Sequence, residues 1–219
     1  MNTAMILAAG RGERLKPLTE IKPKALCVVK GKPLIEHHVS NLAEAGYEKI
    51  VINHAYLGGQ IRQCLGNGER WGVQIIYSAE PPGGLETGGG IVNALPLLGN
   101  QPFITVNADI YTDFDFRLLQ APEPNFIHVI LVNKNPALSH HGDFGLVHQQ
   151  QLTNANPEYT LAGICCYHPQ VFSGCKQGRY SVAPLIRHHA DLAKATASVY
   201  RGLWFDIGSL ERLAAANNA

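Results

Sequence analysis

The chain has 219 residues, 46% of them apolar, which is enough to bury one substantial core, so we expect a single domain over residues 1–219. Its 18 basic and 17 acidic residues leave a formal net charge of +1, which gives no electrostatic basis for binding nucleic acid or a membrane surface. No apolar run approaches the ~18 residues of a membrane span, and the N-terminus lacks the layout of a secretion signal, so we expect a cytoplasmic enzyme. Five cysteines without a Cys-x-x-Cys spacing are predicted to be free thiols.

A glycine-rich loop follows the first predicted strand, the apolar run at residues 4–9. Gly10 and Gly12 remove two side chains, so backbone N–H groups can approach a phosphate closely. Arg14 and Lys24 add fixed positive charge to the same loop. The pattern is neither a Rossmann fingerprint nor a Walker loop, and a bare glycine pair is equally compatible with a surface turn.

Helices and strands alternate along the next part of the chain. Residues 33–45 have the apolar spacing of an amphipathic helix that ends at a glycine. Residues 49–53 are a predicted strand, residues 57–65 a second helix and residues 73–77 a third strand. This order predicts an α/β fold with a mixed, mostly parallel sheet and helices on both faces, whose ligands lie at the carboxyl ends of the strands.

A second glycine-rich segment, residues 80–90, directly follows the third predicted strand, and residues 91–97 are expected to be helical. The three consecutive glycines at residues 88–90 would disfavour a helix by about 1 kcal/mol each, relative to alanine. We therefore interpret them as a place of close backbone approach, with a flexible loop as the alternative.

Two aspartates follow apolar segments that are far apart in the chain. Residues 103–109 are a predicted buried strand that ends at Asp109, and residues 201–209 carry Asp206 after aromatic and apolar residues. Each aspartate alone is compatible with a turn or a helix cap. Together, at one cleft, they are candidate oxygen ligands for Mg²⁺.

The rest of the chain is predicted to contain further strands at residues 126–132, 144–147 and 161–167. The last two are expected to form an antiparallel pair in a small subregion, around residues 133–167, over the cleft. Residues 133–143 are the candidate lid. Asp113 and Asp115 are assigned to a turn and an N-cap before a short helix at residues 116–119, and two helices are predicted at 184–192 and 210–216, the second capped by Ser209.

The first loop supplies the most specific resemblance. The string Gly10-x-Gly12-x-Arg14-Leu15-x-Pro17-Leu18-Thr19, followed by Pro23-Lys24, resembles the signature of the sugar-1-phosphate nucleotidylyltransferases. The resemblance implies a nucleotide-diphospho-sugar transferase fold, with UTP and a sugar 1-phosphate as substrates, the sugar on the side of the 133–167 subregion, and Mg²⁺ as cofactor. Several family members carry a hexapeptide-repeat acyltransferase domain or an oligomer-forming extension, and the sequence shows neither pattern, so we expect a monomeric single-function enzyme. It also implies roles for individual residues: catalysis by Arg14 and Lys24, nucleotide binding by Ala8, Ala9, Gly10, Gly12, Glu80 and Gly88, sugar binding by Asn107, Gly145 and Gly163, and metal binding by Asp109 and Asp206.

The chemistry of the base agrees with the implied role of Glu80. A carboxylate accepts a hydrogen bond from the N3–H of uracil or thymine, and it offers nothing to cytosine, whose N3 has no proton. Within the family, the segments at residues 85–90 and 142–145 resemble enzymes whose acceptor is N-acetylmuramic acid 1-phosphate, which implies a role in peptidoglycan recycling. A hexose 1-phosphate with UTP or dTTP is the alternative. The lactyl carboxylate of the expected acceptor requires a cation or donors, for which His140, His141 and Arg179 are candidates.

One departure from the family concerns the acceptor phosphate. Relatives often carry a Glu-Lys-Pro element before the predicted strand at 161–167, and its lysine meets the sugar phosphate, but this chain has Asn156-Pro157-Glu158 there. Arg201 is our candidate replacement, with a solvated strand residue as the alternative.

Two other classes of protein are alternatives to a nucleotidyltransferase. A metal-dependent glycosyltransferase normally carries an Asp-x-Asp motif, and Asp113-Phe114-Asp115 is such a string, but glycosyl transfer needs no triphosphate-binding loop. A non-catalytic nucleotide sensor of this fold would be expected to have lost Lys24, Asp109 or Asp206, and all three are present.

Overall fold

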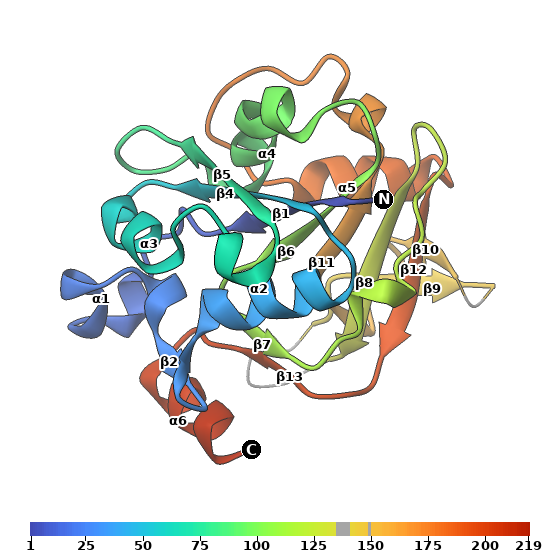
Figure 1. The fold of residues 1–219 in the computed structure, drawn as a ribbon. Coiled ribbons are helices and arrows are strands. Elements are labelled where there is room, and N and C mark those ends of the chain that lie inside the picture. Colours follow the sequence, from blue (N-terminus) through green and yellow to red (C-terminus); the bar gives the residue numbers. More distant parts are fainter. Residues whose placement is uncertain (135–140, 149) are drawn as a thin grey trace.

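The computed structural model describes residues 1–134, 141–148 and 150–219. Within these residues a nine-stranded sheet forms the centre of the molecule, in the order β5-β4-β1-β6-β11-β8-β12-β10-β9 (Figure 1). Its strands are β1 (Thr3–Leu7), β4 (Lys49–His54), β5 (Gln74–Ala79), β6 (Phe103–Asn107), β8 (Ile127–Asn133), β9 (Gly145–Val147), β10 (Gln151–Thr153), β11 (Tyr159–Tyr167) and β12 (Ala195–Tyr200).

The sheet is mixed. Strands β5, β4, β1 and β6 are parallel neighbours, and β12 is parallel to β8. Strand β11 runs antiparallel between β6 and β8, and β9 and β10 continue the sheet antiparallel beyond β12. Two small sheets are added, β2 (Val28–Val29) with β3 (Lys32–Pro33), and β7 (Ile110–Thr112) with β13 (Trp204–Asp206).

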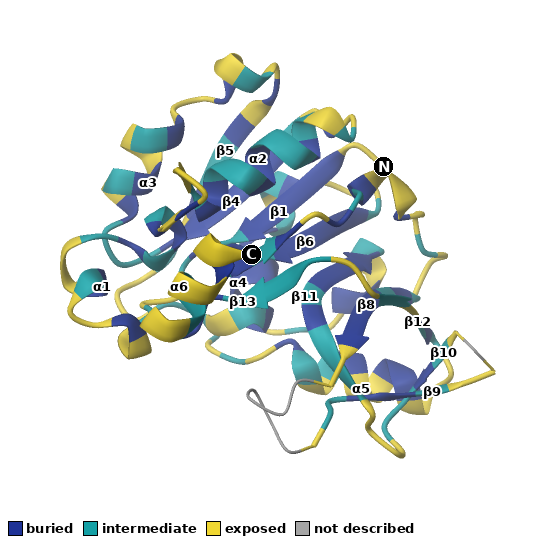
Figure 2. Cartoon of the chain, turned by 90° about the horizontal axis from the view of Figure 1, so that it is seen from below, coloured by how far each residue is buried: buried dark blue, intermediate teal, exposed yellow. Residues whose placement is uncertain are grey.

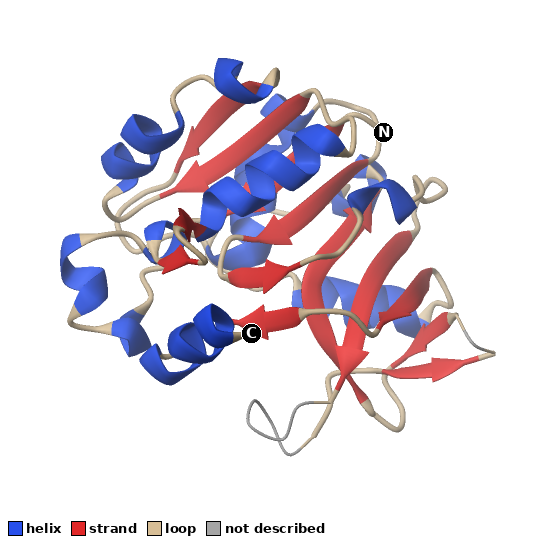
Figure 3. Cartoon of the chain, turned by 60° about the horizontal axis from the view of Figure 1, so that its bottom comes forward, coloured by secondary structure: helices blue, strands red, loops and turns tan. Residues whose placement is uncertain are grey.

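Helices cover both faces of the large sheet (Figure 3). Helices α2 (Leu34–Glu44) and α3 (Gly58–Leu65) contribute to one buried cluster, and α4 (Glu86–Leu98) and α5 (Ala183–Asp191) contribute to the other. Successive residues of β1 alternate between these clusters, because Ala4 and Ile6 pack on one face and Met5 on the other. A strand covered on both faces has no polar side, which explains the continuous apolar run in the sequence.

Helices α1 (Leu18–Ile21) and α6 (Leu210–Asn218) lie at one end of the molecule, and much of their surface is exposed (Figure 2). A third buried cluster, which includes Leu15, Ile207 and Ala216, packs the C-terminal helix beneath the first loop. In the part of the chain that the structure describes, no helix is long and apolar enough to cross a membrane.

The predicted α/β fold and most of the predicted elements are confirmed, and the five cysteines, all in the described part, are free. One helix boundary was wrong: α4 begins at Glu86, so the three glycines lie inside the helix and not before it. Packing explains the difference, since all three glycines are buried against other parts of the chain.

The predicted pairing of the strands near residues 144–147 and 161–167 was also wrong. Strand β9 pairs with β10, and β11 lies between β6 and β8 in the middle of the sheet. Among the described residues, an isolated bridge between Phe144 and Tyr159 joins the first of these segments to the beginning of β11. Strand β11 is the middle strand of the nine, and its residues 164–167 are all buried, but the apolar spacing of a strand does not reveal which neighbours it pairs with.

Candidate active site

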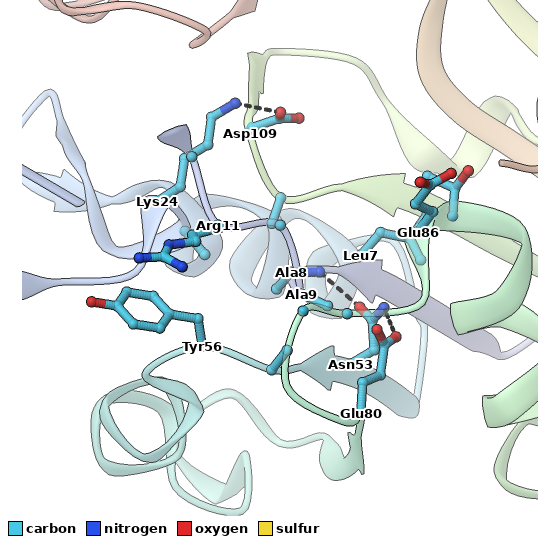
Figure 4. A pocket seen from close by; sticks show the side chains of 18 of the residues that line it. Leu7, Ala8, Ala9, Arg11, Lys24, Asn53, Tyr56, Glu80, Glu86 and Asp109 are labelled. Carbon is cyan, nitrogen blue, oxygen red and sulfur yellow. Dashed lines mark hydrogen bonds and ion pairs between the residues drawn. The ribbon is translucent and has the colours of Figure 1, made fainter. Parts of the chain in front are cut away.

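A cavity of about 830 Å³ opens at the carboxyl ends of β1, β4 and β6 (Figure 4). Its lining comes from the first glycine loop, the ends of the three strands and the residues that follow them, the loop before α4, the first turn of α4 and one residue from the segment before α5. The lining residues are Leu7, Ala8, Ala9, Gly10, Arg11, Gly12, Glu13, Lys24, Ala25, Asn53, Ala55, Tyr56, Glu80, Pro82, Gly83, Gly84, Glu86, Thr87, Asn107, Ala108, Asp109 and Arg179.

The first loop packs so closely that a glycine is required in it. Gly12 has φ = 70°, and a Cβ added there would lie 3.0 Å from the Cβ of Lys24 and 3.0 Å from the side chain of Thr19. The Thr19 hydroxyl donates to the Gly12 carbonyl at 2.8 Å. The loop thus holds the stem of Lys24 against its own backbone and leaves Ala8, Ala9 and Gly10 facing the cavity.

The two predicted metal-binding aspartates are brought together by β-pairing. Strand β13 pairs antiparallel with β7, and the Ile207 N–H donates to the Asp109 carbonyl at 2.8 Å. Burial raises the pKa of Asp206, and the negative charge of Asp109 raises it further, while Lys24 and other cations act in the opposite direction. The influence of Asp109 on Asp206 is that of a nearby like charge.

Each aspartate also has a cationic partner. Lys24 Nζ lies 2.6 Å from Asp109 Oδ2, and Arg212 Nη1 lies 2.8 Å from Asp206 Oδ2. Residues 1–134, 141–148 and 150–219 contain no group of three or more His, Cys, Asp or Glu side chains arranged for a metal ion. A pair of carboxylates completed by substrate phosphates and water is nevertheless a typical donor set for Mg²⁺, so the residues present fit that ion.

Glu80 lies on the opposite wall of the cavity from Lys24 and Asp109 (Figure 4). Its Oε1 accepts a hydrogen bond from Asn53 Nδ2 at 2.6 Å, and its Oε2 accepts one from the Leu85 N–H at 2.7 Å. Each carboxylate oxygen has two lone pairs, so capacity for a ligand donor remains.

Gly88 does not belong to the cavity lining that the described residues form. It is buried, and its N–H donates to the Tyr180 carbonyl at 2.9 Å. A Cβ at Gly89 would overlap the Gly178 carbonyl, and one at Gly90 would lie 2.6 Å from Glu80 Oε1. The three glycines therefore admit neighbouring parts of the protein, while Glu86 and Thr87 line the cavity.

The predicted sugar-side residues are only partly at the cavity. Asn107 lines it, and Gly163 lies beside Asn107, since a Cβ at Gly163 with φ = 74° would be 2.8 Å from Asn107 Nδ2. Gly145 is buried, and a Cβ there would overlap the carbonyl of Ala155. Arg201 is exposed in the connection between β12 and β13, outside the lining that the described residues form.

Arg14 is exposed as well, and its guanidinium lies 3.1 Å from the position that a Cβ at Gly208 would occupy. Its charge lowers the pKa of Asp206, which puts it on the aspartate side of the site. Of the candidates for the lactyl carboxylate, Arg179 lines the cavity, His141 is exposed, and His140 lies outside the described residues, as does most of the predicted lid.

Sequence reasoning missed several residues of the lining. Arg11 pairs with Glu13 at 2.8 Å and lies over the ring of Tyr56, 4.8 Å from its centroid. Its position between Gly10 and Gly12 could have identified Arg11 as a residue of the binding loop. Asn53 at the end of β4 could have been identified as well, because polar side chains at the carboxyl ends of parallel strands face the ligand crevice.

The Asp-x-Asp string lies away from this cavity. Asp115 caps a short helical turn and accepts from the Arg117 N–H at 3.0 Å, as predicted. Asp113 accepts hydrogen bonds from the Tyr200 hydroxyl and the Leu203 N–H. Both aspartates line a separate hollow of about 400 Å³.

Comparisons with known proteins give a consistent result. Residues 3–219 match the family model described as nucleotidyl transferase. The chain is 46% identical to the N-acetylmuramate alpha-1-phosphate uridylyltransferase of Neisseria meningitidis serogroup B, over 96% of this chain and 94% of that protein. It is 32% identical to the Caulobacter vibrioides protein of the same name, over 97% and 94%.

Two solved structures share the fold. A Bacillus anthracis protein in complex with sucrose superposes with a TM-score of 0.86 at 22% identity, covering 99% of this chain and 94% of that one. A UDP-glucose pyrophosphorylase complexed with UDP-glucose gives a TM-score of 0.81 at 21% identity, covering 100% and 97%.

Proposed function

Because the chain belongs to the nucleotidyl transferase family, we propose that it transfers UMP from UTP to N-acetylmuramic acid 1-phosphate. The observation that carries this proposal is the match to two uridylyltransferases of that specificity along nearly the whole of each chain. The products are the UDP-sugar and pyrophosphate. N-Acetylmuramic acid is a peptidoglycan sugar, so the reaction fits the recycling of cell-wall material.

The uracil side of the nucleotide is assigned to the wall that carries Glu80. Its carboxylate accepts the N3–H of uracil, and the tight loop at Gly10 and Gly12 offers backbone N–H groups to the phosphates. The same cavity is lined by Glu80 on one wall and by Lys24 and Asp109 on the opposite wall. This arrangement supports a nucleotide bound with its base at Glu80 and its phosphates toward Lys24 and Asp109.

The chemical step is an in-line displacement at phosphorus. A phosphate oxygen of the sugar phosphate forms a bond to the α-phosphorus of UTP, and the bond between that phosphorus and the β-phosphate oxygen breaks. The attacking oxygen is already ionised at neutral pH, so no side chain has to act as a nucleophile or a base. Catalysis then consists of positioning and the neutralisation of charge.

Two side chains of this chain supply positive charge: Lys24 stabilises the charge that develops on the α-phosphate, and Arg14 holds the leaving pyrophosphate. Asp109 and Asp206 would hold Mg²⁺, which when bound would offset the repulsion between the phosphates. Before substrate enters, the ammonium of Lys24 is held by Asp109 at 2.6 Å, so it is in place beside the reacting groups.

The acceptor differs from simpler hexose phosphates by its lactyl carboxylate. Arg179 lines the cavity with its side chain 63% exposed, and its guanidinium lies 3.3 Å from Glu86, so it is available to a carboxylate ligand. A pocket built for the lactyl and acetamido groups leaves polar groups unpaired around a plain hexose, which disfavours it by about 1–3 kcal/mol per group.

Release of pyrophosphate from UTP with Mg²⁺ and a panel of acceptors tests the proposal. The panel contains the 1-phosphates of glucose, mannose, N-acetylglucosamine and N-acetylmuramic acid, each compared by kcat/KM with UTP and with dTTP. We expect the highest value for N-acetylmuramic acid 1-phosphate with UTP. Preference for glucose 1-phosphate would assign the protein to the hexose enzymes, and absence of pyrophosphate with every acceptor would refute nucleotidyl transfer.

Two arginine variants locate the acceptor contacts. Arg179→Gln should lower kcat/KM for N-acetylmuramic acid 1-phosphate more than for N-acetylglucosamine 1-phosphate, because these acceptors differ only in the lactyl group. Arg201→Gln tests the earlier candidate for the acceptor phosphate: a contact of Arg201 with that phosphate requires kcat/KM to fall equally for both acceptors, and unchanged values would remove Arg201 from the site. Arg117→Gln, at the separate hollow, is the matched control.

A further inference from the structure

One buried amide joins the two ends of the cavity. Asn53, at the carboxyl end of β4, is 2% exposed. Its Oδ1 accepts from the Ala8 N–H at 2.7 Å, and its Nδ2 donates to Glu80 Oε1 at 2.6 Å (Figure 4). The amide thus connects the beginning of the first loop to the carboxylate on the opposite wall.

The chemistry of its partners fixes the orientation of this amide. An N–H can only donate and a carboxylate can only accept, so the reversed amide would place donor against donor and acceptor against acceptor. An aspartate at position 53 would keep the bond to Ala8 but would put a second carboxylate against Glu80. Among side chains of this size, only asparagine satisfies both partners.

The Glu80 carboxylate is fixed from three sides. Asn53 holds one oxygen, and the Leu85 N–H holds the other at 2.7 Å. Helix α4 closes the third side, because a Cβ at Gly90 would lie 2.6 Å from Glu80 Oε1 and 2.8 Å from Asn53 Nδ2. A carboxylate held in this way keeps one direction for accepting a further hydrogen bond, and it is already part of the cavity lining.

We infer that Asn53 is a positioning residue for nucleotide selection, which aims the Glu80 carboxylate at the base and sets its distance from the Ala8 N–H. This inference rests on the proposed function, in which Glu80 accepts the N3–H of uracil. A uracil nucleotide supplies the proton that a fixed carboxylate requires, and a cytosine nucleotide presents a lone pair to it. A carboxylate free to rotate could turn away from cytosine, so loss of Asn53 weakens the discrimination.

The test measures kcat/KM for UTP and for CTP with the same acceptor, in wild type and in Asn53→Ala, Asn53→Asp and Glu80→Ala. We expect the UTP to CTP ratio to fall by about tenfold or more in each variant, with Asn53→Asp at least as severe as Asn53→Ala because it repels Glu80. The control is Asn93→Ala, a partly buried asparagine of α4 that bonds to Ser78 outside the cavity lining. It should leave the ratio unchanged.

A double-mutant cycle separates positioning from simple support of the fold. If Asn53 acts through Glu80, the UTP to CTP ratio of Asn53→Ala/Glu80→Ala equals that of Glu80→Ala alone. A further fall of the ratio in the double variant would overturn the inference. Equal losses with UTP and CTP in the Asn53 variants, or a lowered Tm with an unchanged ratio, would also overturn it.

The proposed role of Glu80 can fail separately. If Glu80→Ala leaves the wild-type ratio unchanged, the assignment of Glu80 to the base is wrong, and the inference falls with it. If Glu80→Ala lowers the ratio and the Asn53 variants do not, only the inference is wrong. For any variant whose turnover is too slow to measure, equilibrium binding of UTP and CTP gives the ratio of their affinities, which reports the ground-state part of the discrimination.

Discussion

His38 allows a quantitative prediction about stability at acid pH. It lies on α2 with 1% exposure, and its Nε2 is 2.9 Å from the Ile110 carbonyl, which can only accept, so Nε2 carries the proton. Within the described structure its Nδ1 has no hydrogen-bond partner. Burial, as the largest cause, lowers the pKa of His38 from 6.5 to about 4.

The sign and size of the effect follow from proton linkage. Between pH 6.5 and 4 the unfolded chain binds a proton at this histidine and the folded chain does not, so the free energy of unfolding falls as the pH falls. Well above pH 6.5 the histidine is neutral in both the folded and the unfolded chain and has no effect. At pH 5 the loss is about 2 kcal/mol, and it approaches about 3 kcal/mol at pH 4.

Urea denaturation at pH 7.5 and pH 5, with EDTA present, compares wild type with His38→Gln. Glutamine can donate to the same carbonyl and does not titrate. We expect the decrease in unfolding free energy between the two pH values to be about 2 kcal/mol smaller in the variant. His188→Gln, which removes an exposed histidine of α5, is the control. Equal pH dependence in wild type and His38→Gln would refute the reasoning.

Three further predictions concern the site. Asp109→Asn and Asp206→Asn should each lower Mg²⁺-dependent kcat by ~100-fold or more with an unchanged fold by circular dichroism, and near-normal rates at saturating Mg²⁺ would contradict the metal assignment. Lys24→Ala should lower kcat more than it weakens UTP binding, because the ammonium of Lys24 stabilises negative charge that develops on the α-phosphate in the transition state. Steady-state kinetics in which only KM rises would contradict that role. Gly89→Ala should destabilise the protein by ~1–3 kcal/mol despite better helix propensity, because its Cβ overlaps the Gly178 carbonyl, and a raised Tm would show that this contact yields easily.

Local features of the structure followed from the sequence alone. The apolar run before Gly10 became β1, because a strand covered on both faces needs no polar side. Ser209 caps α6 and Asp115 caps its helical turn, since a side-chain oxygen a few atoms from free N–H groups needs no distant partner. The tight first loop also followed from nearby residues alone, because Gly12 adopts a positive φ that other residues adopt rarely.

The assembly of the site was decided by tertiary structure. Asp206 meets Asp109 only because β13 pairs with β7, and strand pairing between distant segments leaves no signal in either segment alone. Likewise, the three consecutive glycines show in the sequence that side chains are absent, but they do not show which part of the chain packs against them. In the fold, Tyr180, Gly178 and Glu80 occupy the space next to these glycines. The fold also places Arg179 in the cavity lining and Arg201 outside it. The two side chains have the same chemistry, so only their positions in the tertiary structure distinguish them.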